Sequence, residues 1–173
     1  MVAANCLLPT AGWYITMQNE PSPFPRMGAA LLSLLGLLDA AYLALERVTG
    51  GPIACPVGGG CETVQSSTYA LLFGVPVAFI GVAGYTFLLV VALLSLQFSN
   101  LGGISLDALL LVLASIALLA GIYFMYVQVD LIGAICFWCA MAALLDLLIW
   151  LAALVNWGWN QQGAKEPPLA DHM

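Results

Sequence analysis

Four cysteines stand in two closely spaced pairs and could carry out redox chemistry. Cys55 and Cys61 bracket a proline, a valine and three glycines, and Cys136 and Cys139 form a C-x-x-C motif. Thiolates attack disulfides and exchange partners, so two neighbouring dithiol pairs can relay electrons. A four-cysteine zinc site is an alternative, but its ligands usually have about two to four residues between them, and five separate Cys55 from Cys61. The spacing therefore favours a thiol–disulfide relay.

The C-x-x-C pair lies where the last long apolar segment begins, so it is predicted to open a helix. Residues three apart share a helix face, and a helix N-terminus stabilises negative charge. We therefore expect Cys136 to be the better thiolate. A Cys55–Cys61 disulfide would close a short loop worth only about 2 kcal/mol, and the glycines leave that loop conformational freedom. The first pair is predicted to be mobile and the second fixed.

The composition places these cysteines in a membrane. Of the 173 residues, 63% are hydrophobic and 7% are charged, whereas soluble domains have about 25% charged residues. This composition excludes a soluble enzyme and a disordered protein. A net charge of −6 with three Lys or Arg residues also excludes a surface that follows nucleic-acid phosphates.

Four segments reach the length of about 20 apolar residues that a membrane-spanning helix needs. They cover residues 27–45, 75–96, 108–127 and 134–155. The alternating pattern of a transmembrane barrel is absent. We therefore predict an all-α membrane protein, a four-transmembrane-helix bundle with a short interfacial helix in the first loop, within residues 62–73. Residues 1–26 are predicted to be an N-terminal extension, 27–158 the transmembrane redox domain, and 159–173 a polar tail or linker.

Four spans place both termini on one side of the membrane and both cysteine pairs on the other. Arg26 and Lys165 flank the terminal side and Arg47 the other, which favours termini in the cytosol. The paired cysteines then face the oxidising side, where disulfides persist. Cys6 is left alone on the opposite side as a free thiol.

The motifs together resemble the vitamin K epoxide reductase family over residues 28–157, most closely its cyanobacterial and plastid members. The resemblance implies a four-helix bundle that holds a quinone near its mouth, with no metal. The quinone would be ubiquinone, menaquinone, phylloquinone or vitamin K. The segments that carry the resemblance are Cys55 to Cys61, Ser66-Ser67, Phe73-Gly74-Val75-Pro76 and Cys136-Phe137-Trp138-Cys139.

The resemblance also implies a role for each matching residue. Cys55 would receive electrons from a thioredoxin-fold dithiol protein, and Cys61 would pass them to Cys136. Cys139 would face the quinone and reduce it, with Ser67 in a supporting place at the quinone site. The implied enzyme is a membrane thiol–quinone oxidoreductase that supports disulfide formation, with vitamin K quinone and epoxide reduction as further activities.

The same resemblance implies a bacterial inner membrane or a thylakoid membrane, with the redox cysteines on the periplasmic or lumenal side. The thioredoxin-fold partner would act in trans or belong to a fused domain outside this chain, because the chain holds no second C-x-x-C. The lipid bilayer is the other expected partner, and nucleic acid is not expected.

One residue departs from the animal enzymes, which carry a tyrosine where this chain has Ala143. The hydrogen bond to the quinone carbonyl must then come from elsewhere, and quinone reduction is favoured over epoxide reduction. Asp146 lies seven residues after Cys139, on a similar helix face and about 10 Å deeper. Intramembrane carboxylates are functional candidates, so Asp146 and Asp39 form a possible proton relay.

Three alternatives remain open at this stage. One is a regulatory thiol sensor that uses no quinone. A protonated Asp146 could simply form a hydrogen bond between helices. The whole chain could also be a structural membrane protein, in which the cysteines form loop disulfides or a zinc site.

Overall fold

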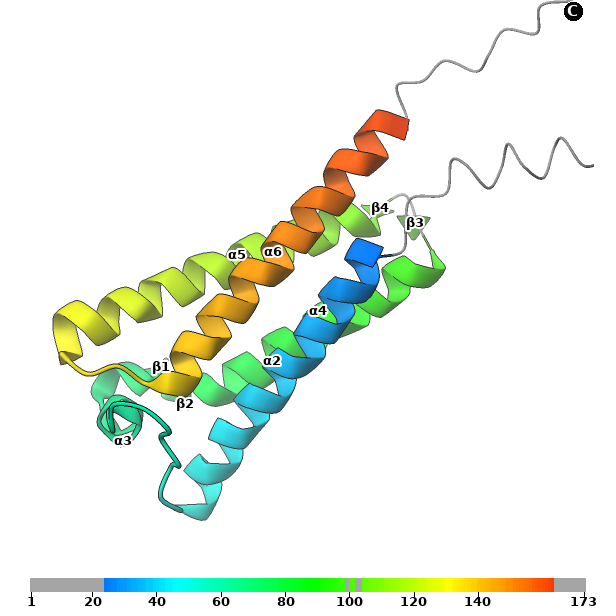
Figure 1. Cartoon of the computed structure of the whole chain (residues 1–173). Coiled ribbons are helices and arrows are strands. Elements are labelled where there is room, and N and C mark those ends of the chain that lie inside the picture. The colour runs from blue at the N-terminus through cyan, green and yellow to red at the C-terminus, as the bar shows by residue number, and fades with distance from the viewer. Residues whose placement is uncertain (1–23, 99, 102–103, 164–173) are drawn as a thin grey trace, which may run out of the picture.

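The computed structural model describes residues 24–98, 100–101 and 104–163 (Figure 1). Within these residues, four helices are long and apolar enough to cross a membrane. This confirms the predicted all-α membrane fold. The helices are α2 (Phe24–Thr49), α4 (Val77–Gln97), α5 (Leu106–Tyr126) and α6 (Phe137–Gly163).

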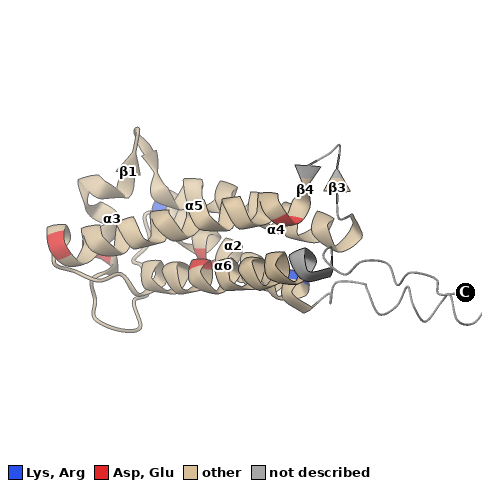
Figure 2. Ribbon diagram, turned by 90° about the horizontal axis from the view of Figure 1, so that it is seen from above, with Lys and Arg blue, Asp and Glu red and all other residues tan. Residues whose placement is uncertain are grey.

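The four helices form a bundle in which α2 packs against α4 and α6, and α5 packs against α6. Small residues let helices approach closely in a membrane bundle: a Cβ added at Gly81 of α4 would lie 3.3 Å from Ala40 Cβ of α2. Large apolar side chains such as Leu35, Ile116 and Leu119 remain exposed on the outside. Figure 2 shows charged positions only at isolated points along the ribbon. The outer surface is therefore suited to lipid.

The first loop contains the predicted short helix, but this helix ends earlier than expected. Helix α3 covers only Cys61–Ser66 and is followed by the 3₁₀ turn η1 (Thr68–Ala70). Strands β1 (Leu71–Leu72) and β2 (Val75–Pro76) then pair antiparallel. Phe73 and Gly74, with φ of 53° and 82°, form the left-handed turn between them. This conformation cannot continue a right-handed helix, so the prediction of a helix through residue 73 is corrected.

The long helices also begin and end at different residues from those predicted. Helix α2 starts at Phe24 and takes in the end of the expected extension, because Pro is tolerated in a first helical turn. Helix α6 starts at Phe137 rather than 134, and it continues to Gly163, into the expected tail. The segment between the third and fourth predicted spans is largely the π-helical turn η2 (Val127–Ile132). Strands β3 (Asn100–Leu101) and β4 (Ile104–Ser105) join α4 to α5.

The bundle has two distinct ends. The start of α2 and the end of α6 lie at one end together with β3 and β4, whereas α3, β1, β2 and the start of α6 lie at the other (Figure 1). The two loops that carry the cysteine pairs are therefore at the same end, as the number of spans predicted. The predicted free thiol, Cys6, lies outside the described residues.

At the end opposite the cysteines, a buried network of polar side chains joins all four helices. Arg26 Nη2 of α2 lies 2.8 Å from Asp107 Oδ2 of α5, and both side chains are buried. Arg26 also donates to the Ser95 carbonyl of α4 at 2.8 Å and to Asn156 Oδ1 of α6 at 3.3 Å. Asn156 in turn donates to Asp107 Oδ1 at 2.6 Å. Because the cation and the carboxylate both have several partners, the network closes this end without leaving an uncompensated charge.

We predict that Asp107→Ala destabilises the bundle by about 3–5 kcal/mol, because it leaves the Arg26 guanidinium buried without its carboxylate. The free energy of unfolding in detergent micelles measures this. Asp130→Ala removes an exposed carboxylate and is the matched control. The double variant Arg26→Met/Asp107→Leu should regain much of the loss. Equal stability of Asp107→Ala and Asp130→Ala would contradict the prediction.

Candidate redox site and adjoining cavity

The first cysteine pair is closed as a disulfide between Cys55 and Cys61, with the Cα atoms 5.9 Å apart. Cys61 is fully buried, while Cys55 is partly exposed. The three glycines between them are each required by the local backbone geometry. Gly58 and Gly59 take left-handed φ values of 81° and 63°, and a Cβ at Gly60 would lie 2.5 Å from the Ile135 carbonyl oxygen. The glycines thus allow a tight turn and bring the loop against the segment before α6.

The second pair stands at the start of α6, as predicted, with Cys136 directly before the first helical residue. The Cys139 N–H points at Cys136 Sγ at 3.4 Å, as in an N-capping contact, and the Cys139 thiol donates to Cys136 Sγ at 2.9 Å. The Cys136 N–H donates to Gln128 Oε1 at 2.8 Å. Gln128 is itself buried on η2, so the π-helical turn fixes the position of Cys136.

These contacts make Cys136 the more acidic thiol of the pair. The hydrogen bond from the Cys139 thiol is the main cause that lowers the pKa of Cys136, against the opposing effect of burial. The backbone N–H groups of Cys139 and Trp138 add to the lowering. Hydrogen bonds to a charged sulfur favour its charged form, which agrees with the expectation that Cys136 is the better thiolate.

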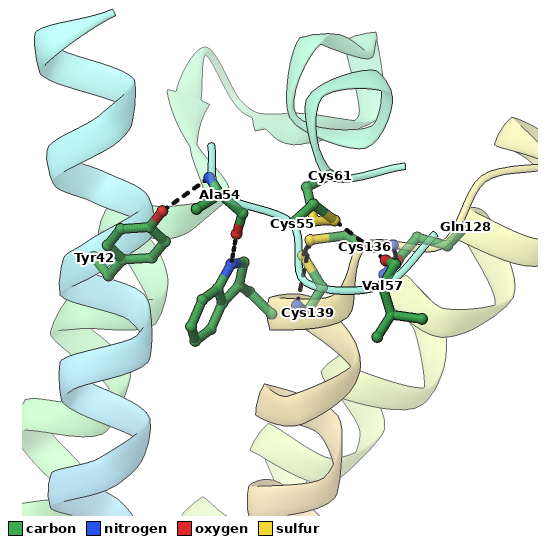
Figure 3. Close-up of a disulfide and its surroundings, with 9 residues drawn as sticks. Tyr42, Ala54, Cys55, Val57, Cys61, Gln128, Cys136 and Cys139 are labelled. Atoms are coloured by element: carbon green, nitrogen blue, oxygen red, sulfur yellow. Dashed lines mark hydrogen bonds between the residues drawn. A yellow bond between two sulfur atoms is a disulfide. The ribbon is translucent and has the colours of Figure 1, made fainter. Parts of the chain in front are cut away.

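The two pairs lie side by side (Figure 3). Cys61, Val64 and Cys136 form one buried cluster, and Cys55 and Cys139 pack against it. Sulfurs that must exchange partners need this proximity. The structure therefore brings together all four cysteines that the sequence singled out.

An aromatic contact holds the first loop over the second pair. Trp138 Nε1, from within the C-x-x-C motif, donates to the Ala54 carbonyl at 2.8 Å, and the Ala54 N–H donates to the Tyr42 hydroxyl at 3.1 Å. The Tyr42 and Trp138 rings are 4.9 Å apart. The residue directly before Cys55 is thus tied to both α2 and α6 (Figure 3).

A cavity of about 340 Å³ lies among the four helices, next to the second pair. Its wall is largely apolar and includes side chains from α2, α4, α5, α6 and the first loop. Cys139 lines it, whereas Cys136 is fully buried beside Cys61. Small-molecule sites typically measure roughly 300–1,000 Å³ and are mainly apolar with few polar groups. The cavity thus has the size and lining of a site for a small, mainly apolar ligand.

Both predicted carboxylates line this cavity, and a tyrosine is hydrogen-bonded to one of them. Asp146 of α6 accepts a hydrogen bond at 2.8 Å from Tyr85 of α4, whose hydroxyl also lies 3.2 Å from the Ala142 carbonyl. Asp39 of α2 is close enough to Asp146 to interact electrostatically. Neither Asp39 oxygen has a hydrogen-bond partner among the described residues. The interhelical hydrogen bond considered for Asp146 is therefore present, at the wall of the cavity.

Ser67 also lines the cavity. Its hydroxyl donates to the Val64 carbonyl at 2.7 Å. A hydroxyl has one proton to donate, so Ser67 can accept a hydrogen bond from a ligand but cannot donate one while it caps α3. Its supporting role stays a prediction.

Sequence reasoning missed three residues that hold this site in place: Tyr85, Gln128 and Trp138. Each carries a polar group on, or directly beside, an apolar span, where lipid offers it no partner. That signal was present in the sequence, but the partner of each group could be known only from the fold. In the described part of the chain, no group of three or more His, Cys, Asp or Glu residues could hold a metal ion.

Four apolar helices, two adjoining cysteine pairs and a cavity at one end define an integral membrane protein equipped for thiol–disulfide chemistry. The Vitamin K epoxide reductase family model matches residues 28–154, and the chain belongs to this family. The thiol-disulfide oxidoreductase LTO1 of Arabidopsis thaliana is 35% identical over 130 residues, which cover 68% of this chain and 33% of that protein. The chain thus spans about a third of the length of this relative. Both findings support a thiol oxidoreductase role.

We predict that Cys136 titrates at a lower pH than an ordinary thiol, whose pKa is about 8.5. Cys139→Ala should move the titration upward, because it removes the thiol that donates to Cys136. Thiolate absorbance in the ultraviolet measures the titration midpoint of Cys136 with and without the Cys139→Ala change. Both proteins carry Cys6→Ala and keep the Cys55–Cys61 disulfide intact. Ser66→Ala, at an exposed position, is the control. An unchanged midpoint in Cys139→Ala would argue against this origin of the acidity.

We also predict that Gly36→Ala disturbs the Tyr85 contact. A Cβ at Gly36 of α2 would lie 2.6 Å from Tyr85 Cδ1, so the ring must move away. Overpacking of this kind costs about 1–3 kcal/mol, measured as the free energy of unfolding. Gly28→Ala is the matched control on the same helix, because a Cβ there meets nothing within 4 Å. Equal stability of the two variants would refute the close packing of α2 and α4 at this point.

Proposed function

We propose that the chain is a membrane thiol–quinone oxidoreductase that moves electrons from an external dithiol protein to a quinone. One observation carries the proposal: Cys139 lines the apolar cavity and is hydrogen-bonded to Cys136, which packs against the Cys55–Cys61 disulfide. The second pair is thus in contact with the first pair on one side and with a ligand-sized cavity on the other. That is the arrangement a two-step relay requires.

The proposed relay consists of two thiol–disulfide exchanges followed by the reduction of one quinone, and its electrons balance. The external dithiol reduces the Cys55–Cys61 disulfide and becomes a disulfide itself. Cys61 then attacks the oxidised second pair at Cys136, the Cys55–Cys61 disulfide closes again, and Cys136 and Cys139 are left as thiols. Quinone reduction to quinol reoxidises that pair. In this proposed order, a closed first pair and a free second pair, which are the states present in the structure, come directly before quinone reduction.

The exposure of the cysteines supports this order. Cys55 is partly exposed and Val57 and Gly58 beside it are exposed, whereas Cys61 and Cys136 are fully buried. An external protein can therefore reach Cys55 but not the inner sulfurs. We propose a thioredoxin-fold dithiol protein as the donor, acting in trans or as a fused domain.

The quinone is proposed to be ubiquinone, menaquinone, phylloquinone or vitamin K, each with a flat ring that suits the apolar cavity. Vitamin K quinone reduction belongs to this proposal, and epoxide reduction is less supported because Ala143 replaces the tyrosine of the animal enzymes. The proposed setting is a bacterial inner membrane or a thylakoid membrane, with the cysteines on the periplasmic or lumenal side.

The test gives the purified protein a soluble quinone analogue and a reduced thioredoxin-fold protein, and follows quinone absorbance. We expect the wild type to consume quinone over many turnovers. Cys139→Ala should stop this, because no dithiol then faces the cavity, and Cys55→Ala should stop delivery from the protein donor. Cys6→Ala is the matched cysteine control and should turn over normally.

The result also separates this proposal from its alternative. No quinone consumption by the wild type, together with a Cys55–Cys61 disulfide that resists a reduced thioredoxin-fold protein, would favour a structural membrane protein with a loop disulfide. The disulfide already occupies two of the four sulfurs that a four-cysteine zinc site would need.

A further inference from the structure

Asp39 is a buried carboxyl group without a hydrogen-bond partner at the wall of the cavity. The residue is 9% exposed, and neither side-chain oxygen has a partner among the described residues. Buried polar groups normally have partners, and a buried one without them calls for an explanation. The cavity that Asp39 lines also exposes Cys139. A ligand that occupies this cavity would therefore meet both the reducing sulfur and the unpartnered carboxyl.

The proton balance of quinone reduction identifies what such a carboxyl could supply. Conversion of a quinone to a quinol takes up two electrons and two protons. Closing the Cys136–Cys139 disulfide releases two electrons, but only the Cys139 proton when Cys136 is already a thiolate. The hydrogen bond from the Cys139 thiol to Cys136 Sγ fits that proton arrangement. One proton must then come from another group that reaches the cavity.

We infer that Asp39 donates this second proton to the quinone oxygen, and that Asp146, held by its hydrogen bond from Tyr85, keeps the proton on Asp39 until then. The inference rests on the proposed function and names a catalytic residue for it. Asp39 would also supply the hydrogen bond to the quinone carbonyl that the alanine at position 143 cannot make. The proton returns to Asp39 from water after the quinol leaves.

The hydrogen-bond directions distinguish the two carboxyl groups. Tyr85 donates to Asp146 Oδ1, and a charged carboxylate is the natural acceptor for such a bond. No donor points at Asp39 among the described residues, which suits a protonated carboxyl that is itself a donor. Two charged carboxylates at one apolar wall would repel each other with little screening. A single proton, held on Asp39, relieves this repulsion.

Three single-residue changes test the inference on the full chain. The protein is reduced at all cysteines, freed of reductant, and mixed with a soluble quinone analogue in a single turnover. General acids typically contribute about 10²–10⁴-fold to a rate, so Asp39→Asn should slow quinone reduction by about 100-fold or more. Asp39→Glu, which keeps a carboxyl at the cavity, should recover most of the rate. Tyr85→Phe removes the hydrogen bond that holds Asp146 and should cost up to about tenfold, as expected for one such bond.

Ser33→Ala is the matched control. Ser33 lies on the same helix, is fully buried, and its hydroxyl has no hydrogen-bond partner in the described part of the chain. It does not line the cavity. We expect the Ser33→Ala variant to reduce quinone at the same rate as the wild type. Thiol exchange between Cys55–Cys61 and a small dithiol should be unchanged in all variants, which shows that each has folded.

A second readout does not depend on turnover. Quinone added to the oxidised protein should shift the infrared carbonyl band of a protonated carboxyl group. The band should be lost in Asp39→Asn and kept in Asp146→Asn and Ser33→Ala. Absence of a quinone-sensitive carboxyl band in the wild type would overturn the inference, even if Asp39→Asn does not fold.

The outcomes separate the two proposals. If the wild type reduces quinone and Asp39→Asn does so equally fast, this inference is wrong and the proposed function stands. If the wild type does not reduce quinone at all, the proposed function fails and this inference fails with it.

Discussion

Polar side chains on the four long helices can find partners only inside the bundle, because lipid offers them none. This constraint organises the molecule from end to end. At one end, Arg26 and Asp107 satisfy each other and tie all four helices together. Near the cavity, Tyr85 satisfies Asp146. Asp39 and Ser33 are left without a hydrogen-bond partner in the described structure, and of these two only Asp39 lines the cavity, where a ligand can reach it.

Apolar length and cysteine spacing were enough to predict the helices and the gathering of the two pairs, but not the polar network. Arg26, Asp107 and Asn156 each lie one residue outside a predicted span. Polar residues at the edge of an apolar run are taken as its boundary, so the side chains that lock the bundle were left outside the predicted spans. Their pairing depends on how the four helices are rotated about their axes, and sequence periodicity does not fix this rotation when helices are apolar on every face.

In the candidate site, too, some residues could be predicted from the sequence and others could not. Asp39 and Asp146 were predicted because acidic residues inside a span are rare and costly. Tyr85 was not, because a tyrosine in an apolar segment is unremarkable until a close packing partner such as Gly36 places its hydroxyl at Asp146. The first-loop helix was predicted too long, since the left-handed turn at Phe73 is an exception to the usual preference of that residue type.

A relay between two cysteine pairs needs one pair that can move and one that cannot, and the contacts of the pairs differ accordingly. Cys136 is fixed by the buried Gln128 hydrogen bond and by its place at the start of α6. The loop before Cys55 is held by two hydrogen bonds and one ring contact around Trp138. Each such bond contributes only about 0.5–1.5 kcal/mol, so the loop can shift while α6 stays in place. The network at Arg26 joins the four helices at the far end of the bundle, and none of its members lines the cavity.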